Sequence, residues 1–117
     1  MIAMILGMIA LGMVVFTAVA LTFAWVLKKL KEKRFLQNVK RVMIADIQRL
    51  ANSSDNTITL DQLDELANKG VTHVMADIDA SGNIVGEIEV IKDTNRQLDD
   101  EVDKLLGRER MKVVEIC

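Results

Sequence analysis

Residues 2–27 read IAMILGMIALGMVVFTAVALTFAWVL, and residues 28–34 read KKLKEKR. The first stretch holds no charged side chain, whereas the second holds five basic side chains and one glutamate. About 20 apolar residues in a helix span the hydrocarbon core of a bilayer, and basic residues beside a span are retained on the cytoplasmic side. The junction between the two stretches therefore predicts a transmembrane helix over residues 1–27. The predicted location is a membrane, in a single-pass protein with its N-terminus outside and its C-terminal domain in the cytoplasm.

Charge divides the rest of the chain into a basic and an acidic part. Residues 28–42 hold seven Lys or Arg and one Glu, and residues 43–117 hold eight basic and sixteen acidic residues. The balances are +6 and −8, so the overall charge of −2 conceals a basic collar before an acidic remainder. The collar could contact anionic lipid head groups or act only as a stop-transfer signal. The acidic remainder speaks against nucleic acid as a partner, because phosphate binding needs clustered Lys and Arg.

The segment 28–52 is expected to continue the helix beyond the membrane as a stalk. Between Leu27 and Ala51 the chain has neither Pro nor Gly, and most residues are good helix formers. Apolar residues recur at spacings of three or four, which places them on one helix face. These residues are Leu36, Val39, Met43, Ile47 and Leu50. A polar cluster over 52–56 is predicted to end the helix.

Residues 57–117 predict a small cytoplasmic α+β domain with the element order α-β-β-α-β. Thr59 can cap a short helix that ends before Gly70, where a left-handed residue is expected. A second helix over 98–106 has acidic residues near its start and a glycine after its end.

A hairpin is predicted between these two helices. The runs 71–79 and 84–92 alternate between apolar and polar residues, and the turn between them contains Gly82. This turn places Ile78 opposite Ile84 and makes one face of the hairpin apolar throughout. The other face is predicted to be exposed.

The last strand is predicted over 111–116. A strand-helix-strand crossover is almost always right-handed, so this strand should lie parallel to the second hairpin strand and beside the first. The result is a three-stranded mixed sheet with strand order 2-1-3.

Small residues in the apolar stretch suggest a packing seam. They recur with a seven-residue period, which favours a left-handed helix pair, and small side chains allow transmembrane helices to approach closely. The predicted seam is Ala3, Gly7, Ala10, Val14 and Thr17. Together with the stalk face it indicates a homo-oligomer or a membrane-protein partner.

The hairpin turn also resembles the first eight positions of an EF-hand calcium loop. Asp77, Asp79, Ser81 and Asn83 would supply the ligands. The resemblance covers residues 77–84, and it departs from the family pattern at the twelfth position, which is Ile88 rather than glutamate.

No enzymatic motif is present in the sequence, and no cofactor is predicted. The chain has no Gly-rich phosphate loop and no Cys/His cluster, and its one cysteine is the last residue. The single histidine, His73, is predicted to form an exposed cross-strand pair with Glu89.

The function expected from these features is that of a membrane-anchored adaptor or accessory subunit that presents the small acidic domain in the cytoplasm, and no enzymatic activity is expected. Two alternatives remain open. One is a calcium-responsive membrane sensor that uses the 77–84 loop, and the other is a small membrane-permeabilising protein of the lysis type.

Overall fold

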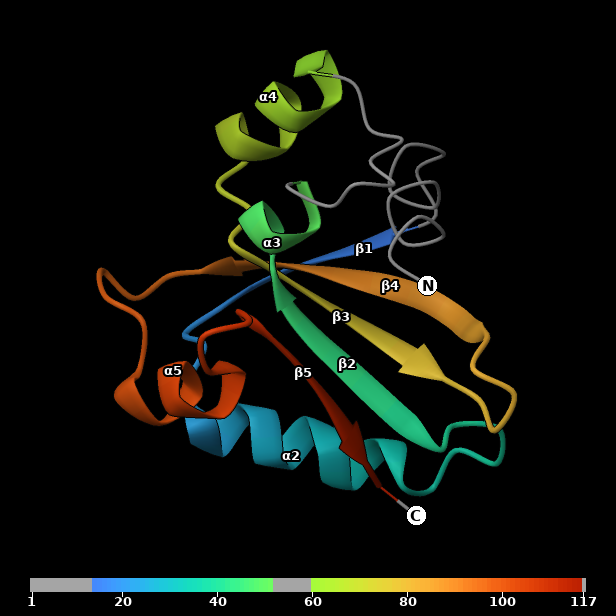
Figure 1. Ribbon diagram of the computed structural model, residues 1–117. Coiled ribbons are helices and arrows are strands. Elements are labelled where there is room, and N and C mark those ends of the chain that lie inside the picture. The colour runs from blue at the N-terminus through green and yellow to red at the C-terminus, as the bar shows by residue number, and fades with distance from the viewer. Residues whose placement is uncertain (1–13, 52–59, 117) are drawn as a thin grey trace.

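A computed structural model describes residues 14–51 and 60–116, which form five strands and four helices (Figure 1). In chain order the elements are β1 (Val14–Val19), α2 (Phe23–Lys33), β2 (Arg41–Asp46), α3 (Ile47–Ala51), α4 (Leu60–Asn68), β3 (His73–Ile78), β4 (Ile84–Asp93), α5 (Asp100–Leu106) and β5 (Met111–Glu115). The strands build a mixed sheet with the order β1-β4-β3-β2-β5. β1 runs parallel to β4, and every other neighbouring pair is antiparallel.

The predicted transmembrane helix is wrong over the part of it that the structure describes. The sequence VVFTAV forms β1, because β-branched and aromatic residues fit a pleated sheet. The helix α2 begins only after Thr22, whose hydroxyl accepts a hydrogen bond from the Trp25 amide at 3.2 Å. Within residues 14–51 and 60–116 no helix combines the length and the apolar character that a bilayer crossing requires. The predicted single-pass topology, with an outer N-terminus and a cytoplasmic domain, is contradicted together with this helix.

The predicted stalk helix is also wrong, because α2 ends at Lys33 and the chain turns into β2. Residues 42–45 are all buried, with Val42 and Ile44 on one side of the sheet and Met43 and Ala45 on the other. Consecutive apolar residues suit a strand that is covered on both faces. The three-to-four spacing over this region was therefore not the signature of a helix face.

The hairpin of β3 and β4 confirms the predicted turn and the pairing beside it. Gly82 has a positive φ of 85°, and Ile78 lies opposite Ile84. Beyond Asp77 the register moves by two residues, and Gly86 in β4 has a φ of +69°. A bulge at this glycine explains the shift. Because the shift is even, it leaves every side chain on the face that the alternation predicts.

The predicted strand order 2-1-3 is wrong because β2 takes the place beside β3. β5 pairs with β2 instead, and it runs antiparallel to β2 and so parallel to β3. The prediction lacked a strand over 41–46, since that segment was assigned to the stalk. The α+β class itself holds, with five strands rather than three.

Helices cover both sides of the sheet (Figure 1), and each side has its own apolar core. The side packed by α2 and α5 is termed the α2 face, and the side toward α3 and α4 is termed the α4 face. The α2-face core contains Leu21, Val26, Leu30, Val39, Val42, Ile44, Met75, Ile91, Val102, Leu106 and Ile116. The α4-face core contains Met43, Ala45, Leu50, Leu66, Val71, Val74, Ala76, Ile78, Ile88 and Val90.

Candidate functional site

The predicted seam residues do not form a surface among the described residues. Ala3, Gly7 and Ala10 lie outside those residues. Val14 and Thr17 belong to β1, where both side chains are half-buried and Val14 packs against the α4-face core.

The predicted stalk-face residues are distributed over separate parts of the fold. Leu36 lies in the turn after α2 and is 49% exposed, whereas Val39 and Met43 are buried in the cores of opposite faces. Ile47 is half-buried in α3. The residues were predicted to share one side of a helix, and the strand β2 separates them.

The four predicted calcium ligands have different surroundings. The Asp77 carboxylate is on the α2 face, 2.7 Å from the Lys33 ammonium. Asp79 instead closes the hairpin turn, since its Oδ1 accepts hydrogen bonds from the amides of Ser81 and Asn83, each at 2.9 Å. In the described part of the chain no three His, Cys, Asp or Glu side chains group together as metal ligands. The calcium interpretation stays a prediction that this geometry does not support.

Two lysines of the basic collar point inward from α2 and bind carboxylates of the hairpin. Lys29 lies 3.2 Å from Glu89, and its ammonium also sits 5.6 Å from the centre of the Trp25 ring. The Lys33 ammonium lies close enough to the Asp77 carboxylate to form an ion pair, although the two groups are not aligned for a hydrogen bond. These contacts fix the rotation of α2 on the sheet, because both ion pairs lie on the side that packs against the strands.

The opposite side of α2 presents apolar and basic residues to solvent. Phe35 is 88% exposed and Leu27 is 40% exposed. Two adjoining hollows, of about 700 and 370 Å³, share Leu27 and Lys31 and extend from the end of α2 to β5. This region is termed the α2–β5 surface. Its lining residues are Ala24, Leu27, Lys28, Leu30, Lys31, Glu32, Arg34, Phe35, Val114, Glu115 and Ile116.

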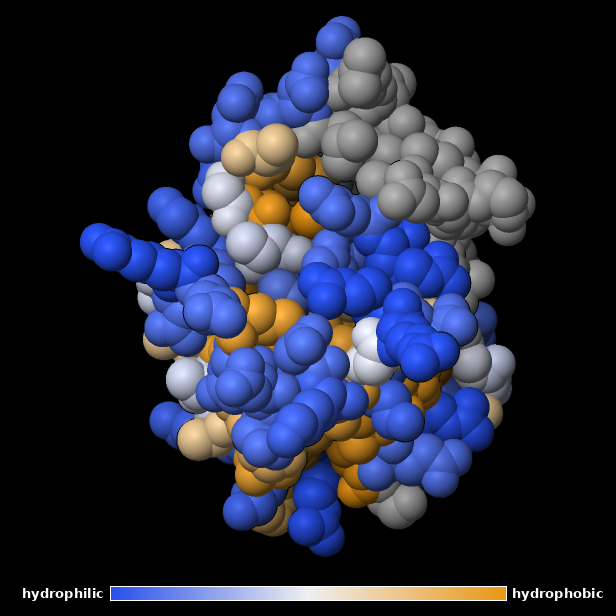
Figure 2. All heavy atoms as spheres, turned by 60° about the vertical axis from the view of Figure 1, so that its left-hand side comes forward, coloured by the Kyte–Doolittle hydropathy of each residue, from blue (hydrophilic) through white to orange (hydrophobic). Residues whose placement is uncertain are grey.

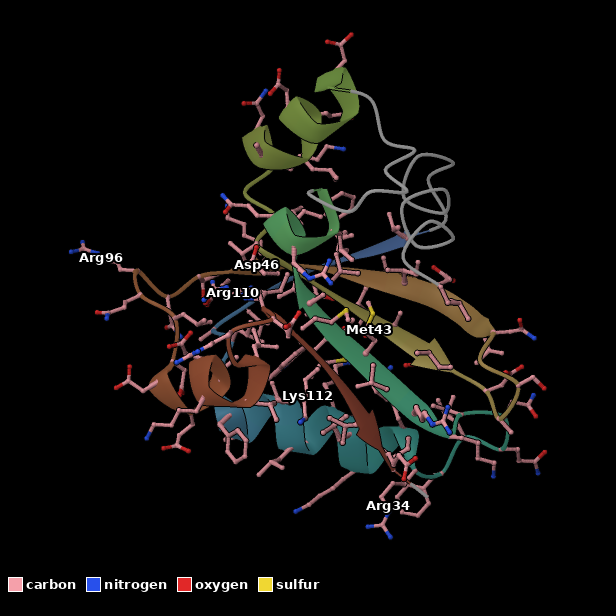
Figure 3. The ribbon with its side chains drawn as sticks, in the orientation of Figure 1. Arg34, Met43, Asp46, Arg96, Arg110 and Lys112 are labelled. Carbon is pink, nitrogen blue, oxygen red and sulfur yellow. The ribbon has the colours of Figure 1, made fainter. Side chains whose placement is uncertain are left out.

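Positive charge dominates the rim of the α2–β5 surface. Lys28, Lys31 and Arg34 form no ion pair with any described residue. Of the two acidic lining residues, Glu115 is engaged with Arg41 at 3.5 Å, and Glu32 leaves one unpaired negative charge beside the three unpaired positive ones. Arg34 projects away from the body of the molecule near the end of α2 (Figure 3). A surface that joins exposed apolar side chains to unpaired cations suits a ligand that carries both apolar groups and negative charge.

A polar cluster lies at the opposite end of β2, next to the start of β5 (Figure 3). The Arg110 guanidinium donates hydrogen bonds to Asp46 at 2.8 Å and to Asp103 at 3.2 Å. The Asp46 amide in turn donates to the Arg110 carbonyl at 2.9 Å. Arg110 has a φ of +58°, a conformation that non-glycine residues seldom adopt. The hydrogen bonds with Asp46 explain how this conformation is held, and the bond from the guanidinium to the Asp46 carboxylate raises the pKa of Arg110 above its usual value.

A hollow of about 220 Å³ adjoins this cluster and is lined by side chains of both signs. The lining residues are Asp46, Gln48, Arg49, Arg108, Glu109 and Arg110. The cations and anions here nearly balance, so the hollow favours no ligand of one charge.

His73 is buried on the α2 face, so the predicted exposed pair with Glu89 is wrong. The bulge places it opposite Ile91, and its side chain is 4% exposed. Its Nδ1 lies 2.8 Å from the Thr72 hydroxyl. That hydroxyl oxygen also lies 3.3 Å from the Ile91 carbonyl, and it accepts a hydrogen bond from the Asp93 amide at 3.2 Å. If that hydroxyl donates to Ile91, Nδ1 carries the imidazole proton.

The second imidazole nitrogen of His73, Nε2, has no partner among the described residues. Burial lowers the pKa of His73, since a charged ring would lose its hydration there, while Asp46 and Asp93 raise this pKa in part and Arg110 lowers it. The neutral ring therefore belongs to the folded core.

Hydrophobic side chains reach the surface elsewhere as well. Seen from the side on which α5 and the loop before it lie, they show in patches between hydrophilic ones (Figure 2). The α2–β5 surface differs from such patches because an aromatic ring, unpaired cations and a sheet edge adjoin there.

Comparison with known proteins adds no assignment, since no family model, no curated protein and no solved structure matches this chain. The sequence reasoning missed the α2–β5 surface because it expected Phe35 and Leu36 inside a continuous stalk helix. The signal that could have identified it is the pair of adjacent apolar residues in FL at 35–36, directly after the basic run that ends at Arg34.

Proposed function

We propose that this chain is an adaptor or accessory subunit that binds a partner protein through the α2–β5 surface. The observation that carries this proposal is the exposure of Phe35, at 88%, on a hollow that is also lined by Leu27, which is 40% exposed. Aromatic side chains contribute strongly to protein interfaces, and large apolar groups exposed together commonly mark such interfaces.

The inner side of α2 supports the proposal by making the outer side rigid. Val26 and Leu30 are buried against the sheet, and the ion pairs of Lys29 and Lys33 anchor the helix at two further points. A surface that is fixed before binding loses little conformational entropy when a partner associates.

The charge of the rim specifies what kind of partner fits. Lys28, Lys31 and Arg34 surround the apolar residues, so the partner surface should combine acidic and apolar side chains. Charges at a rim mainly accelerate association, whereas Phe35 and Leu27 would supply the affinity.

Site-specific photo-crosslinking of the full chain in its own cells tests the proposal. A photoreactive phenylalanine derivative replaces Phe35 in one version and the exposed loop residue Arg96 in the control version (Figure 3). We expect one defined adduct from position 35 and none from position 96. Mass spectrometry identifies the partner, which is then purified.

Titration of that purified partner completes the test. The double variant Leu27→Ser with Phe35→Ser should bind at least about tenfold more weakly than the unchanged chain, which corresponds to about 1.4 kcal/mol. Ala80→Ser, in the exposed hairpin turn, should bind normally. Equal adducts from positions 35 and 96, or adducts only with a second copy of the chain, would overturn the proposal.

A further inference from the structure

The unpaired edge of β5 borders the α2–β5 surface, and its backbone is oriented for strand addition. The Asp46 amide donates to the Arg110 carbonyl, and the Ile116 amide donates to the Lys40 carbonyl. Since alternate residues of a strand face the same neighbour, the even-numbered residues from Arg110 to Ile116 bond to β2. The amides and carbonyls of Met111, Val113 and Glu115 therefore point outward from the sheet.

These outward groups have no strand to bond with in the part of the chain that the structure describes, because β5 ends the strand order. An exposed sheet edge of this kind is a template for another extended chain. Proteins that bind peptides by strand addition obtain affinity from such backbone groups and specificity from pockets for alternate side chains.

From this edge we infer that the partner binds as an extended segment added to β5, with the pattern acidic–x–apolar–x–acidic. This inference rests on the proposed function and names the partner chemistry for the same surface. The three positions of the pattern correspond to three residues that point to the α2 face, namely Lys112 and Val114 in β5 and Ile116 directly after it.

The central apolar position follows from the surroundings of Val114. In an added strand, the side chain opposite Val114 points to the same face of the sheet. There it would enter the hollow of about 370 Å³ that Val114 lines together with Leu27, Leu30 and Ile116. An aliphatic side chain fits this lining.

The two acidic positions follow from the cations on either side. Lys112 is exposed on β5, and the position opposite it should carry a carboxylate. At the other end, the position opposite Ile116 lies near Lys31 and Arg34, which line the same hollow. The pattern is symmetric, so it holds for a parallel and for an antiparallel segment.

The same charges speak against a second copy of β5 as the occupant. Antiparallel pairing about Val114 would place Lys112 opposite the partner copy's Ile116, and pairing about Val113 would place it opposite Val114. Glu115 points to the opposite face from Lys112, so no symmetric register sets a carboxylate opposite that lysine.

A synthetic peptide titrated into the full chain tests the inference. The probe is a capped nonapeptide that has aspartate, leucine and glutamate at alternate positions and threonine at all the others. The control peptide has lysine in place of both acidic residues. Amide NMR should show slowed hydrogen exchange at Met111, Val113 and Glu115 on binding. The lysine peptide should bind about tenfold more weakly, as expected for the loss of two rim ion pairs.

Val113→Pro provides the sharpest variant, because it removes an outward amide and none of the bonds to β2. Proline is tolerated on an edge strand where its nitrogen faces away from the sheet. This variant should lose peptide binding at least tenfold relative to Val113→Thr, about 1.4 kcal/mol, while amide shifts of β2 and β3 confirm the fold. If Val113→Pro disturbs those shifts, Lys112→Glu decides instead, since it should remove most of the preference for the acidic peptide over the lysine peptide.

Two results would overturn the inference: peptide binding without protection of the three β5 amides, or equal binding of both peptides. Failure of this inference can be distinguished from failure of the proposed function. If crosslinking at position 35 succeeds and Val113→Pro leaves the identified partner's affinity unchanged, the surface binds its partner in another way.

Discussion

The two faces of the sheet are built from the same strands and are both covered, yet they differ in chemistry. In β3, Val74, Ala76 and Ile78 point to the α4 face, where the core is purely apolar. The alternate residues of β3 include His73 and Asp77, which point to the α2 face and are buried as well. Polar residues at alternate positions of β3 predict that this face is exposed to solvent, but helices cover it.

The carboxylates of the hairpin on the α2 face lie beside basic side chains, and one of the two imidazole nitrogens of His73 has a side-chain partner. Lys33 lies beside Asp77, Lys29 beside Glu89, and Thr72 bonds to His73. Burying a charge is unfavourable unless it is paired, so the basic residues of α2 explain how the carboxylates of the hairpin can be covered. The comparison teaches that alternation in a strand predicts which residues share a face, but not whether that face is exposed.

The largest expected effect lies on the apolar face, where Ile88 is fully buried. Ile88→Ala leaves a cavity in the α4-face core and should lower the free energy of unfolding by about 3–4 kcal/mol. Urea unfolding measures the change. Leu27→Ala is the matched control, since this 40%-exposed side chain should change stability by less than about 0.5 kcal/mol. Similar losses for the two variants would contradict the described core.

The next effect comes from the ion pair on the α2 face. Lys33→Met leaves the Asp77 carboxylate covered without its cation, and the side chains of the pair retain only 13% and 12% exposure. We expect a loss of about 2 kcal/mol, below the value for a completely buried pair because some solvent reaches it. Lys31→Met, on the outer side of α2, should be nearly neutral.

A second substitution separates charge from packing at this site. Adding Asp77→Leu to Lys33→Met removes the unpaired carboxylate and should return the free energy of unfolding to within about 1 kcal/mol of the unchanged chain. If the double variant is less stable than Lys33→Met alone, the Asp77 charge is not what the lysine compensates.

Local signals in the sequence predicted the parts of the fold that local chemistry determines. Gly82 closes the hairpin turn, and Gly70 ends α4, where the amides of Gly70 and Val71 bond to the carbonyls of Ala67 and Leu66. Gly107 has a positive φ after α5, as its position after a helix indicated. Each of these depends on neighbours within a few residues.

The remainder of the fold depends on contacts that the sequence does not reveal. An uncharged apolar run is compatible with a bilayer span and also with a buried strand followed by a helix. Only the β-branched residues of β1 and the helix cap at Thr22 favoured the strand followed by a helix. Nothing near Lys33 indicates that Asp77 is its partner. The extent of the candidate surface was hidden too, because it depends on where α2 ends and on the position of β5 beside that helix.

An intermediate effect is expected from pH, through His73. Its pKa in the folded chain is lowered below 6.5, so the unfolded chain binds more protons in the interval beneath that value. Stability is therefore fully present above pH 6.5 and decreases as the pH falls toward the folded-state pKa. Urea unfolding at several pH values measures this slope, and His73→Phe should flatten it. An unchanged slope in that variant would assign the pH dependence to other groups.

The smallest expected effect concerns the second ion pair of the α2 face. Lys29 and Glu89 retain 28% and 17% exposure, so water screens their attraction more than that of Lys33 and Asp77. Lys29→Gln should lower the free energy of unfolding by only about 0.5–1 kcal/mol, partly through the lost contact with the Trp25 ring. Raising the salt concentration should reduce the difference for Lys29→Gln more than that for Lys33→Met. If both variants respond equally to salt, solvent screens the two ion pairs to the same extent, and the difference in their exposure would not determine their strength.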